Sequence, residues 1–492
     1  MTYIAKKLNL ITMYQLLIYG LSILAALSLI FSATGYLTLS FSSLIYSLAL
    51  LLLVCYLTNS LLARAWHVIP ARGSWLITAL ILYCIMAPST SVKIAFASAL
   101  AGVLAMASKY IIARNQRHLL NPAAVGAVAV SLMGLTATTW WIGSQVMVPY
   151  VIILALTVVY KLRHTALFVT FVLVSVAITL LVTDRNVTTL GDALHVLIIS
   201  SPLFFLGGVM LTEPTTLPVQ KSMQLVYAGL VGLLFTIHVR IFGTFLAPAI
   251  ALLLGNVFSY ALNPKQNVTL TLKKITEVAP DIFRLTFSPH KKLIFKAGQY
   301  MQWTLASKDN DGHGNRRTFT IASSPTDDEI VLGIKTGVPR SSFKKALLGL
   351  NTGDVIQGGY VAGEFTLPFN AKQPLVFLAG GIGITPFISM LRYLMATNDK
   401  RPVTLYYFLT ATTQVFDQAT LDLAAEHGIV TKLVVGSRTE QLQHATTLGI
   451  AKHPNATFYI SGPPAMVETF TGYLHEQGIK RSAIKTDTFT GY

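Results

Sequence analysis

A glycine-rich turn in the C-terminal half has the composition of a nucleotide-binding loop. Residues 380–386 read Gly-Gly-Ile-Gly-Ile-Thr-Pro and follow the apolar run Pro374–Ala379. The run predicts a buried strand, and a helix is expected from Pro386 to about Met395. Glycines at such a strand-to-helix turn let the backbone approach a dinucleotide closely. The candidate contacts are Gly380, Gly381, Gly383, Thr385 and Pro386.

The residues around this turn predict two soluble domains. Short alternating runs, rich in β-branched and aromatic residues, predict a small antiparallel β-barrel that ends near Leu367. From Gln373 onward, strands and helices alternate, which is typical of a parallel α/β sheet. We therefore expect a barrel over 266–371 and an α/β domain over 372–492. The predicted barrel strands are 267–274, 282–288, 300–305 and 329–336, and the predicted parallel strands are 374–379, 403–409, 432–435 and 457–460.

The segment 267–492 resembles the ferredoxin-NADP reductase superfamily. Residues 317–320 read Arg-Thr-Phe-Thr and match its Arg-x-Tyr-Ser/Thr flavin motif, with Phe in place of Tyr. Residues 461–466 read Ser-Gly-Pro-Pro-Ala-Met and resemble its Cys-Gly-Pro-x-x-Met motif. The resemblance implies that the barrel binds FAD and that the α/β domain binds NAD(P)H.

The resemblance also assigns roles to single residues of the flavin site. It implies that Arg317 pairs with the FAD pyrophosphate as a charge-assisted fork. Phe319 would pack on the flavin, and Thr320 would form a hydrogen bond near the N5 atom, where hydride arrives. Serines ahead of a predicted helix suit a second phosphate contact, since backbone N–H groups at a helix start attract anions. The remaining flavin contacts are Thr318, Ile334, Lys335, Thr336, Ser341 and Ser342.

On the nicotinamide side, Ser461 replaces the family's cysteine, and Gly462 and Pro463 complete the loop. Hydride transfer is cofactor chemistry positioned by the protein, so we expect activity to survive this change. The pair Ser437-Arg438 resembles the family's 2′-phosphate contact and favours NADPH over NADH, although a surface arginine is an ordinary alternative. Tyr492 is a candidate to stack on the flavin and move when nicotinamide enters; a disordered terminus is the alternative. The candidate catalytic residues are Thr320, Ser461 and Tyr492.

The N-terminal half, residues 1–265, is predicted to lie in a membrane. The whole chain of 492 residues is 53% hydrophobic and only 12% charged, with a mean hydropathy of +0.60. A membrane span needs about 20 apolar residues. The first apolar run lacks a cleavage pattern and is expected to be a span rather than a signal peptide. The ten candidate spans are 10–32, 38–62, 74–88, 92–109, 120–137, 142–160, 165–183, 190–211, 224–241 and 243–262.

Loop charges predict the orientation of these spans. With ten spans, the loops expected inside hold eleven Lys or Arg residues and the outer loops or helix ends hold three. Positive residues favour the cytoplasmic side. We therefore expect a multi-pass inner-membrane protein whose two termini and nucleotide-binding domains lie in the cytoplasm.

Short motifs in this half recur at one spacing. Ala-Pro-Ser-Thr at 87–90 recurs as Glu-Pro-Thr-Thr at 213–216, where 214 − 88 = 126, and Pro122 recurs as Pro248, where 248 − 122 = 126. The spacing predicts a five-helix unit used twice, and an odd helix number would invert the second copy. Such repeats bind ligands at symmetry-related positions, although prolines and small residues also recur by chance.

Two motifs in the N-terminal half resemble the Nqr/Rnf membrane subunits, the B subunit of the sodium-pumping NADH:quinone reductase and the D subunit of the Rnf complex. Residues 118–126 read His-Leu-Leu-Asn-Pro-Ala-Ala-Val-Gly, and residues 207–218 read Gly-Gly-Val-Met-Leu-Thr-Glu-Pro-Thr-Thr-Leu-Pro. The resemblance covers about 10–262 and implies a flavin within the membrane domain. The candidate contacts are Asn121, Thr212, Glu213, Thr215 and Thr216.

The family often attaches FMN covalently to a threonine in an outer loop. Here that loop, residues 183–192, has no acceptor at the expected place. We therefore expect a non-covalent FMN or riboflavin-type flavin. A solvated loop carboxylate for Glu213 and a helix cap for Asn121 are the structural alternatives.

Other protein classes fit the sequence poorly. The two cysteines, Cys55 and Cys84, cannot supply four thiolates to an iron–sulfur cluster. The net charge of +17 accompanies no nucleic-acid-binding motif. No predicted helix carries two histidines, which disfavours a haem-containing ferric reductase or NADPH oxidase. We expect no metal site.

We interpret the chain as a membrane-bound NAD(P)H dehydrogenase. Electrons would pass from NAD(P)H through FAD to a membrane flavin, and then to a quinone or an extracytoplasmic acceptor. The repeat leaves open an alternative function, that of a redox-driven Na⁺ or H⁺ transporter. For either function we expect the protein to contact membrane lipid, and either is compatible with a homo-oligomer.

Overall fold

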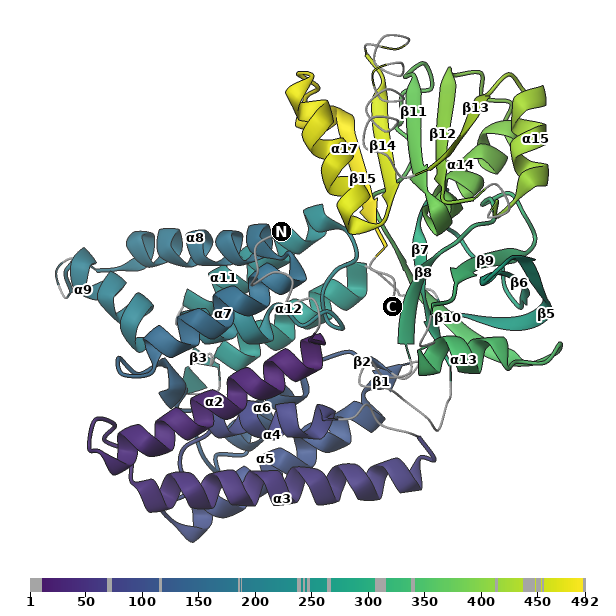
Figure 1. Ribbon diagram of the computed structural model, residues 1–492. Coiled ribbons are helices and arrows are strands. Elements are labelled where there is room, and N and C mark those ends of the chain that lie inside the picture. The colour runs from purple at the N-terminus through teal and green to yellow at the C-terminus, as the bar shows by residue number, and fades with distance from the viewer. Residues whose placement is uncertain are drawn as a thin grey trace. The chain divides into compact units, whose positions relative to one another are not determined.

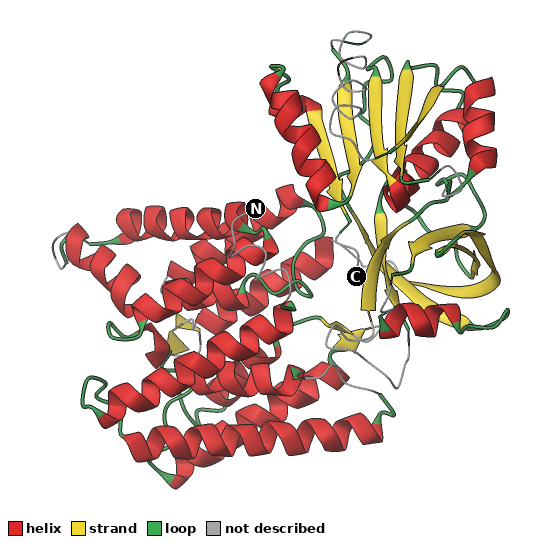
Figure 2. Cartoon of the chain, in the orientation of Figure 1, coloured by secondary structure: helices red, strands yellow, loops and turns green. Residues whose placement is uncertain are grey.

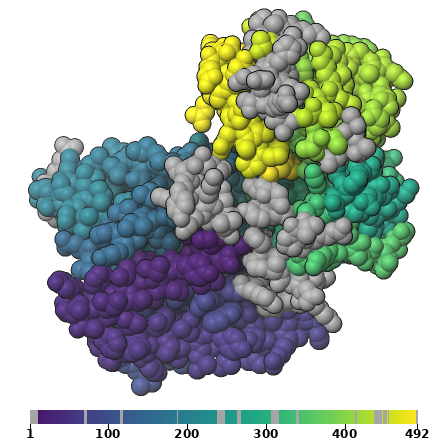
Figure 3. Space-filling model, viewed as in Figure 1, coloured from purple at the N-terminus to yellow at the C-terminus, as the bar shows by residue number. Residues whose placement is uncertain are grey.

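The computed structural model divides the chain into two compact units, Met1–Pro264 and Lys265–Tyr492. They are coloured purple to teal and green to yellow in Figure 1, and Figure 3 shows them in space-filling form. The structure describes residues 11–68, 73–114, 117–184, 186, 188–236, 240–241, 244–245, 248–262, 267–305, 316–337, 341–411, 415–436, 447, 453 and 455–489.

The first unit is built almost entirely of helices (Figure 2). Among the residues that the structure describes, four helices are long and apolar enough to cross a membrane: α2 (Met13–Ala33), α3 (Phe41–Ala65), α5 (Val92–Ile111) and α8 (Thr165–Val182). The segments Leu190–Ser200 and Leu203–Met210 meet at a bend of 52° and could together form a fifth span. Shorter helices fill the remaining predicted segments: α4 (Ser74–Ile85), α6 (Pro122–Leu132), α7 (Val148–Leu162), α11 (Lys221–Thr236) and α12 (Pro248–Leu262).

The long helices expose large apolar side chains on their outer faces. Ile23 of α2, Leu53 of α3 and Leu173 of α8 are 59%, 57% and 63% exposed. A helix that is apolar on all faces is stable where its outer face is also covered by an apolar environment. These helices are therefore compatible with a membrane-embedded segment.

The helices of this unit pack in a pattern that occurs twice. In the first half α3 packs on α5, and α5 packs on α6; in the second half α8 packs on α11, and α11 packs on α12. A short hairpin follows each inner helix, β1 (Ala113–Arg114) with β2 (Arg117–His118), and β3 (Arg240–Ile241) with β4 (Thr244–Phe245). Helices that occupy the same place in the two halves also touch, α2 with α7 and α6 with α12.

The second unit begins with a six-stranded antiparallel barrel. Its strand order is β8-β7-β10-β5-β6-β9, and a bridge between Ile321 and Leu332 joins the two edge strands. The barrel core holds Trp303 and Phe287, both fully buried. The strands are β5 (Asn267–Ala279), β6 (Ile282–Pro289), β7 (Tyr300–Thr304), β8 (Arg316–Thr320), β9 (Ile330–Lys335) and β10 (Val355–Ala362), with helix α13 (Ser342–Leu348).

An α/β lobe follows the barrel. Its five strands are all parallel, in the order β13-β12-β11-β14-β15, so the chain order reverses between β11 and β14. Ligands of open α/β sheets bind at such a switch point, at the carboxyl ends of the strands. The elements are β11 (Leu375–Gly380), α14 (Thr385–Ala396), β12 (Val403–Leu409), α15 (Gln418–Glu426), β13 (Val430–Val435), β14 (Thr457–Gly462), α17 (Pro464–Glu476) and β15 (Ile484–Thr488).

The barrel and the α/β lobe belong to one compact unit, and polar and apolar contacts join them. Arg392 Nε lies 2.9 Å from Asp327 Oδ2, and Arg284 Nη1 lies 3.1 Å from Asp417 Oδ2. One apolar core contains residues of both, among them Phe365 and Phe387. These contacts hold the α/β lobe against the barrel.

Candidate functional site

The glycine-rich turn lies at the switch point of the parallel sheet. Strand β11, all of whose residues are buried, ends at Gly380, and a single 3₁₀ turn leads into α14. A side chain at Gly383 would meet the end of β14, since its Cβ would lie 2.5 Å from the Ser461 carbonyl oxygen. Gly381 has a φ of +53°, a conformation that glycine adopts without strain. The turn thus brings two loop backbones together where a dinucleotide could lie.

Ser461 is the neighbour of this turn on β14. Its residue is fully buried, and its hydroxyl has no hydrogen-bond partner among the residues that the structure describes. Buried polar groups are nearly always satisfied, so the hydroxyl marks a place where a polar group of a ligand fits. Asp487 of β15 pairs with Ser461 in the sheet register, and sequence reasoning did not identify it.

The predicted flavin motif occupies β8, an edge strand of the barrel. Thr320 is buried, Phe319 is half-buried and packs on Phe343 with ring centroids 5.9 Å apart, and Thr318 is exposed. Tyr300 pairs with Thr320 across the strands. Burial, and after it the nearby Tyr360, Asp487 and Glu364, raises the pKa of Tyr300 to about 12. Asp487 therefore lies near both Ser461 and Tyr300, the strand partner of Thr320.

Two cations come together beside this motif. The Arg317 guanidinium lies 5.4 Å from the centre of the Phe343 ring and donates from Nη1 to the Arg316 carbonyl at 2.8 Å. Lys344 is only 7% exposed, and burial, followed by the positive charge of Arg317, lowers its pKa. Two adjacent cations in a partly buried place suit an anionic ligand. The residues present therefore fit the pyrophosphate of FAD, which Arg317 and Lys344 would hold.

The residues of the second predicted phosphate element differ in where their side chains lie. Ser341 caps α13 by accepting from the Lys344 backbone N–H at 3.3 Å, and the Lys335 carbonyl accepts from Lys344 Nζ at 2.9 Å. Thr336, however, is buried and donates its hydroxyl to Asp281 Oδ1 at 2.9 Å. Ile334 also lies in the barrel core. Thr336 and Ile334 thus support the loop from inside, whereas Lys344, which sequence reasoning did not identify, lies at the cationic site.

Three predicted residues lie outside the described part of the chain. They are Ser437 and Arg438, which bear on the choice between NADPH and NADH, and the terminal Tyr492. Gly462, Pro463, Thr385 and Pro386 lie at the switch point of the sheet, with Pro386 at the start of α14.

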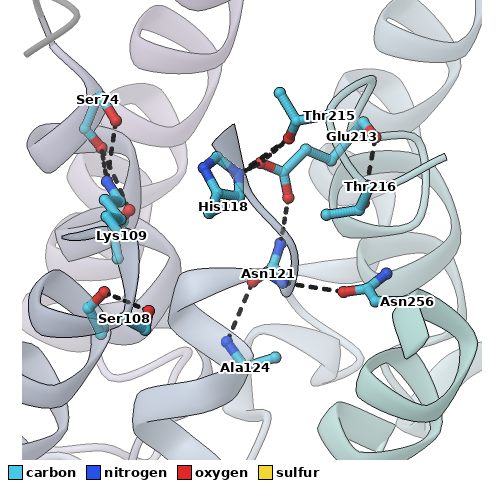
Figure 4. Close-up of polar contacts among 12 residues, drawn as sticks. Ser74, Ser108, Lys109, His118, Asn121, Ala124, Glu213, Thr215, Thr216 and Asn256 are labelled. Atoms are coloured by element: carbon cyan, nitrogen blue, oxygen red, sulfur yellow. Dashed lines mark hydrogen bonds and ion pairs between the residues drawn. The ribbon is translucent and has the colours of Figure 1, made fainter. Parts of the chain in front are cut away.

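A second polar cluster lies in the helical unit (Figure 4). Glu213, in the loop after the bent pair, places Oε1 2.5 Å from His118 Nε2 and accepts from the Asn121 amide at Oε2, at 2.9 Å. The Thr215 hydroxyl lies 2.9 Å from His118 Nε2 and 3.0 Å from Glu213 Oε1. Three of the five predicted membrane-site residues, Asn121, Glu213 and Thr215, therefore meet around one histidine.

Two buried residues that sequence reasoning did not identify support this cluster. Asn256 of α12 accepts from the Asn121 backbone N–H at 2.9 Å and donates to the Tyr227 hydroxyl of α11 at 3.0 Å. Asn121 itself caps α6 by accepting from the Ala124 N–H, as its structural alternative predicted. The other predicted residues, Thr212 and Thr216, donate their hydroxyls to the carbonyls of Gly208 and Glu213. The Thr216 side chain also forms a hydrogen bond with Tyr227 of α11, so both threonines are engaged by protein groups.

Comparison with known proteins places the C-terminal half among reductases. Residues 377–471 match the family described as the oxidoreductase NAD-binding domain. The reductase component of propane 2-monooxygenase from Mycolicibacterium goodii is 29% identical over 248 residues, covering 46% of this chain and 69% of that protein. The NAD(P)H-flavin reductase of Aliivibrio fischeri is 27% identical over 183 residues, covering 35% and 74%. A structure of a ferredoxin NADP+ reductase from Neisseria gonorrhoeae with bound FAD and NADP matches at 18% identity and a TM-score of 0.40, covering 47% of this chain and 100% of that one.

The C-terminal half therefore contains an oxidoreductase NAD-binding domain and is similar to reductase components and to an NAD(P)H-flavin reductase. The chain that carries it is a flavin-dependent NAD(P)H oxidoreductase, as the sequence predicted.

The unusual pKa of Asp487 gives the first testable prediction. Burial raises it from 3.8 to about 6. The native state therefore keeps this proton to higher pH than the unfolded chain does, and ionising Asp487 destabilises the native state as pH rises from about 4 through 6. Asp487→Asn should remove this cost, which we place at about 3 kcal/mol at neutral pH. The thermal midpoint of the second unit should then rise by roughly 6–12 °C at pH 7.5, and much less at pH 4.5.

The fluorescence of Trp303, the only tryptophan of the second unit, reports this transition. Asp328→Asn is the matched control, because Asp328 is exposed. Equal gains for Asp487→Asn at both pH values would contradict a raised carboxyl pKa.

Proposed function

We propose that the chain is a membrane-bound NAD(P)H dehydrogenase that passes electrons from its FAD module to a flavin in the helical unit, and from there to a quinone or an extracytoplasmic acceptor. The reductase module supplies the first half of this proposal. Bound NAD(P)H supplies a hydride and bound FAD accepts it, so that the electrons can leave one at a time.

In the module, the chain's own residues bind and orient these groups. Arg317 and Lys344 neutralise the pyrophosphate, and the buried Thr320 presents its hydroxyl at the end of the flavin motif. The turn at Gly383 and the hydroxyl of Ser461 line the nicotinamide side. Together these contacts would bring the two rings into contact and exclude water from the hydride path.

The observation that carries the membrane half of the proposal is the polar cluster around Glu213. Polar side chains inside an apolar helical unit are costly and are functional candidates for that reason. The cluster combines amide, hydroxyl, carboxylate and imidazole groups, which suit the polar edge of an isoalloxazine. The likeness of residues 118–126 and 207–218 to the Nqr/Rnf subunits supports the same assignment.

The recurring helix contacts support an inverted repeat in this unit. The pairs α3–α5 and α8–α11 correspond, and so do the two hairpins that precede α6 and α12. Contacts between α6 and α12, whose first residues are Pro122 and Pro248, fit a two-fold axis between the halves. We propose ten membrane segments, with both termini and the reductase module in the cytoplasm.

Flavin content tests this function. Purified full-length protein should release at least two flavins per chain on acid denaturation, because neither is covalently attached, and its spectrum should lack a haem Soret band. NADPH or NADH should bleach all of the flavin absorbance. One flavin per chain, or a second flavin that the nicotinamide nucleotide never reduces, would contradict the proposed electron path.

A further inference from the structure

The first unit contains very few carboxylates, and only one of them is enclosed. Among residues 1–264 the sequence has three acidic residues, Asp184, Asp192 and Glu213. Asp184 and Asp192 are exposed, whereas the Glu213 side chain is 23% exposed and both of its oxygens are engaged. Partial burial of a carboxylate in an apolar unit costs free energy unless hydrogen bonds and charges compensate it. The compensation here comes from a histidine.

Glu213 and His118 form an acid–base pair that can hold one transferable proton. The 2.5 Å separation of Oε1 and Nε2 requires a hydrogen between the two atoms. His118 is 17% exposed in its side chain, so the pair is in partial contact with the outside of the unit. The Thr215 hydroxyl contacts both His118 and Glu213, which restricts the orientation of the two side chains relative to each other.

The buried side of the pair is rigid. Asn121 donates to the second oxygen of Glu213 and is only 3% exposed, and Asn256 and Tyr227 behind it are 1% and 0% exposed. Besides His118, the titratable groups in the described part of the unit that interact electrostatically with Glu213 are Lys109 of α5 and Tyr227 of α11. Lys109 is itself held by the Ser74 carbonyl and hydroxyl, each at 2.9 Å. Asn121 and Asn256 therefore act as positioning residues for a carboxylate whose outer face stays reachable.

We infer that the His118–Glu213 pair donates a proton to an acceptor of the quinone class that is reduced in the helical unit. This inference rests on the proposed function, which brings the electrons there. The overall reaction is NAD(P)H + H⁺ + quinone → NAD(P)⁺ + quinol. The nicotinamide is oxidised by two electrons, each quinone carbonyl becomes an O–H group, and the pair supplies a proton as one of these O–H bonds forms. Water restores the proton through the exposed edge of the pair.

The test compares two acceptors in the full-length protein in lipid vesicles. Ferricyanide takes electrons without protons and reports the reductase module, whereas a short-chain ubiquinone analogue needs protons. The ratio of the quinone rate to the ferricyanide rate should fall at least tenfold in Glu213→Gln and in His118→Ala. Imidazole in the buffer should restore the ratio in His118→Ala, and the quinone rate of the wild type should fall as pH rises, a dependence that Glu213→Gln lacks. The matched control is Asp192→Asn, which changes an exposed carboxylate of the same unit and should keep the wild-type ratio.

Each other outcome overturns the inference. An unchanged ratio in Glu213→Gln shows that the carboxylate donates nothing. A lower ratio without imidazole rescue and with an unchanged pH profile assigns the pair a structural role. Loss of the flavin of the helical unit from Glu213→Gln limits Glu213 to the flavin contact of the proposed function and overturns its role as a proton donor. A wild type that reduces ferricyanide but no quinone also overturns the inference, because the pair then has no quinone to protonate; the proposed function would stand with an extracytoplasmic acceptor, and it fails separately if the helical unit holds no flavin that NAD(P)H reduces.

Discussion

Gly383→Ala is expected to lower kcat/KM for NAD(P)H by about 100-fold while leaving bound FAD in place. The new Cβ would lie 2.5 Å from the Ser461 carbonyl oxygen and 2.7 Å from the Gly462 Cα. Both atoms are backbone at the end of a central strand, so they cannot rotate away. Overpacking of this kind costs about 1–3 kcal/mol, and a shift of about 1 Å in a hydride-transfer site costs about two orders of magnitude in rate.

Two other glycines of the same lobe provide comparisons for this prediction. At Gly380 the added atom would meet the Met466 side chain, which can move, so Gly380→Ala should be milder. Gly472, within helix α17 of the same lobe, has open space around it, and Gly472→Ala is the matched control. Stopped-flow reduction of the flavin by NADPH and NADH measures the effect. Full reduction rates in Gly383→Ala would show that the cofactor does not use this turn.

The soluble fold could be predicted because its signals are local. Strand β12 (Val403–Leu409) has the predicted bounds, and β11 and β14 differ by one or two residues. Strands β8, β10 and β15 were missed. Strand β15 reads Ile-Lys-Thr-Asp-Thr, which carries few apolar residues because it forms the edge of the sheet, so periodicity gives little signal.

The candidate sites depended more on tertiary structure. The cationic site includes Lys344, which no sequence pattern identifies. Lys344 lies beside Arg317 because helix α13 packs its neighbour Phe343 against the Arg317 guanidinium. In the helical unit, the motif containing Asn121 and the loop containing Glu213 were found separately, 92 residues apart. Their direct hydrogen bond, and the role of Asn256 behind them, depend on helix packing that no local pattern encodes. The ten spans and their orientation stay predictions, since four described helices have the length and apolarity to cross alone.

The second large effect is expected at the flavin pyrophosphate. Arg317→Met should raise the dissociation constant for FAD by about 10- to 100-fold, because charge-assisted hydrogen bonds contribute about 1.5–3 kcal/mol. Lys344 would remain as the other cation, and its amine is already engaged by the Lys335 carbonyl. A single ammonium cannot reproduce the planar fork, so Arg317→Lys should restore only part of the affinity.

Fluorescence titration of the flavin-depleted protein with FAD measures these constants. Arg316→Met is the matched control, because Arg316 adjoins Arg317 on β8 and successive side chains point to opposite faces of a strand. The flavin of the helical unit should be retained in Arg317→Met, since its proposed contacts lie around Glu213 in the other unit. The variant should therefore keep about one flavin per chain that NADPH no longer reduces, which separates the two proposed flavins by the path of their electrons. An unchanged affinity for FAD in Arg317→Met would remove Arg317 from the pyrophosphate site and leave Lys344 as its only candidate cation among the described residues.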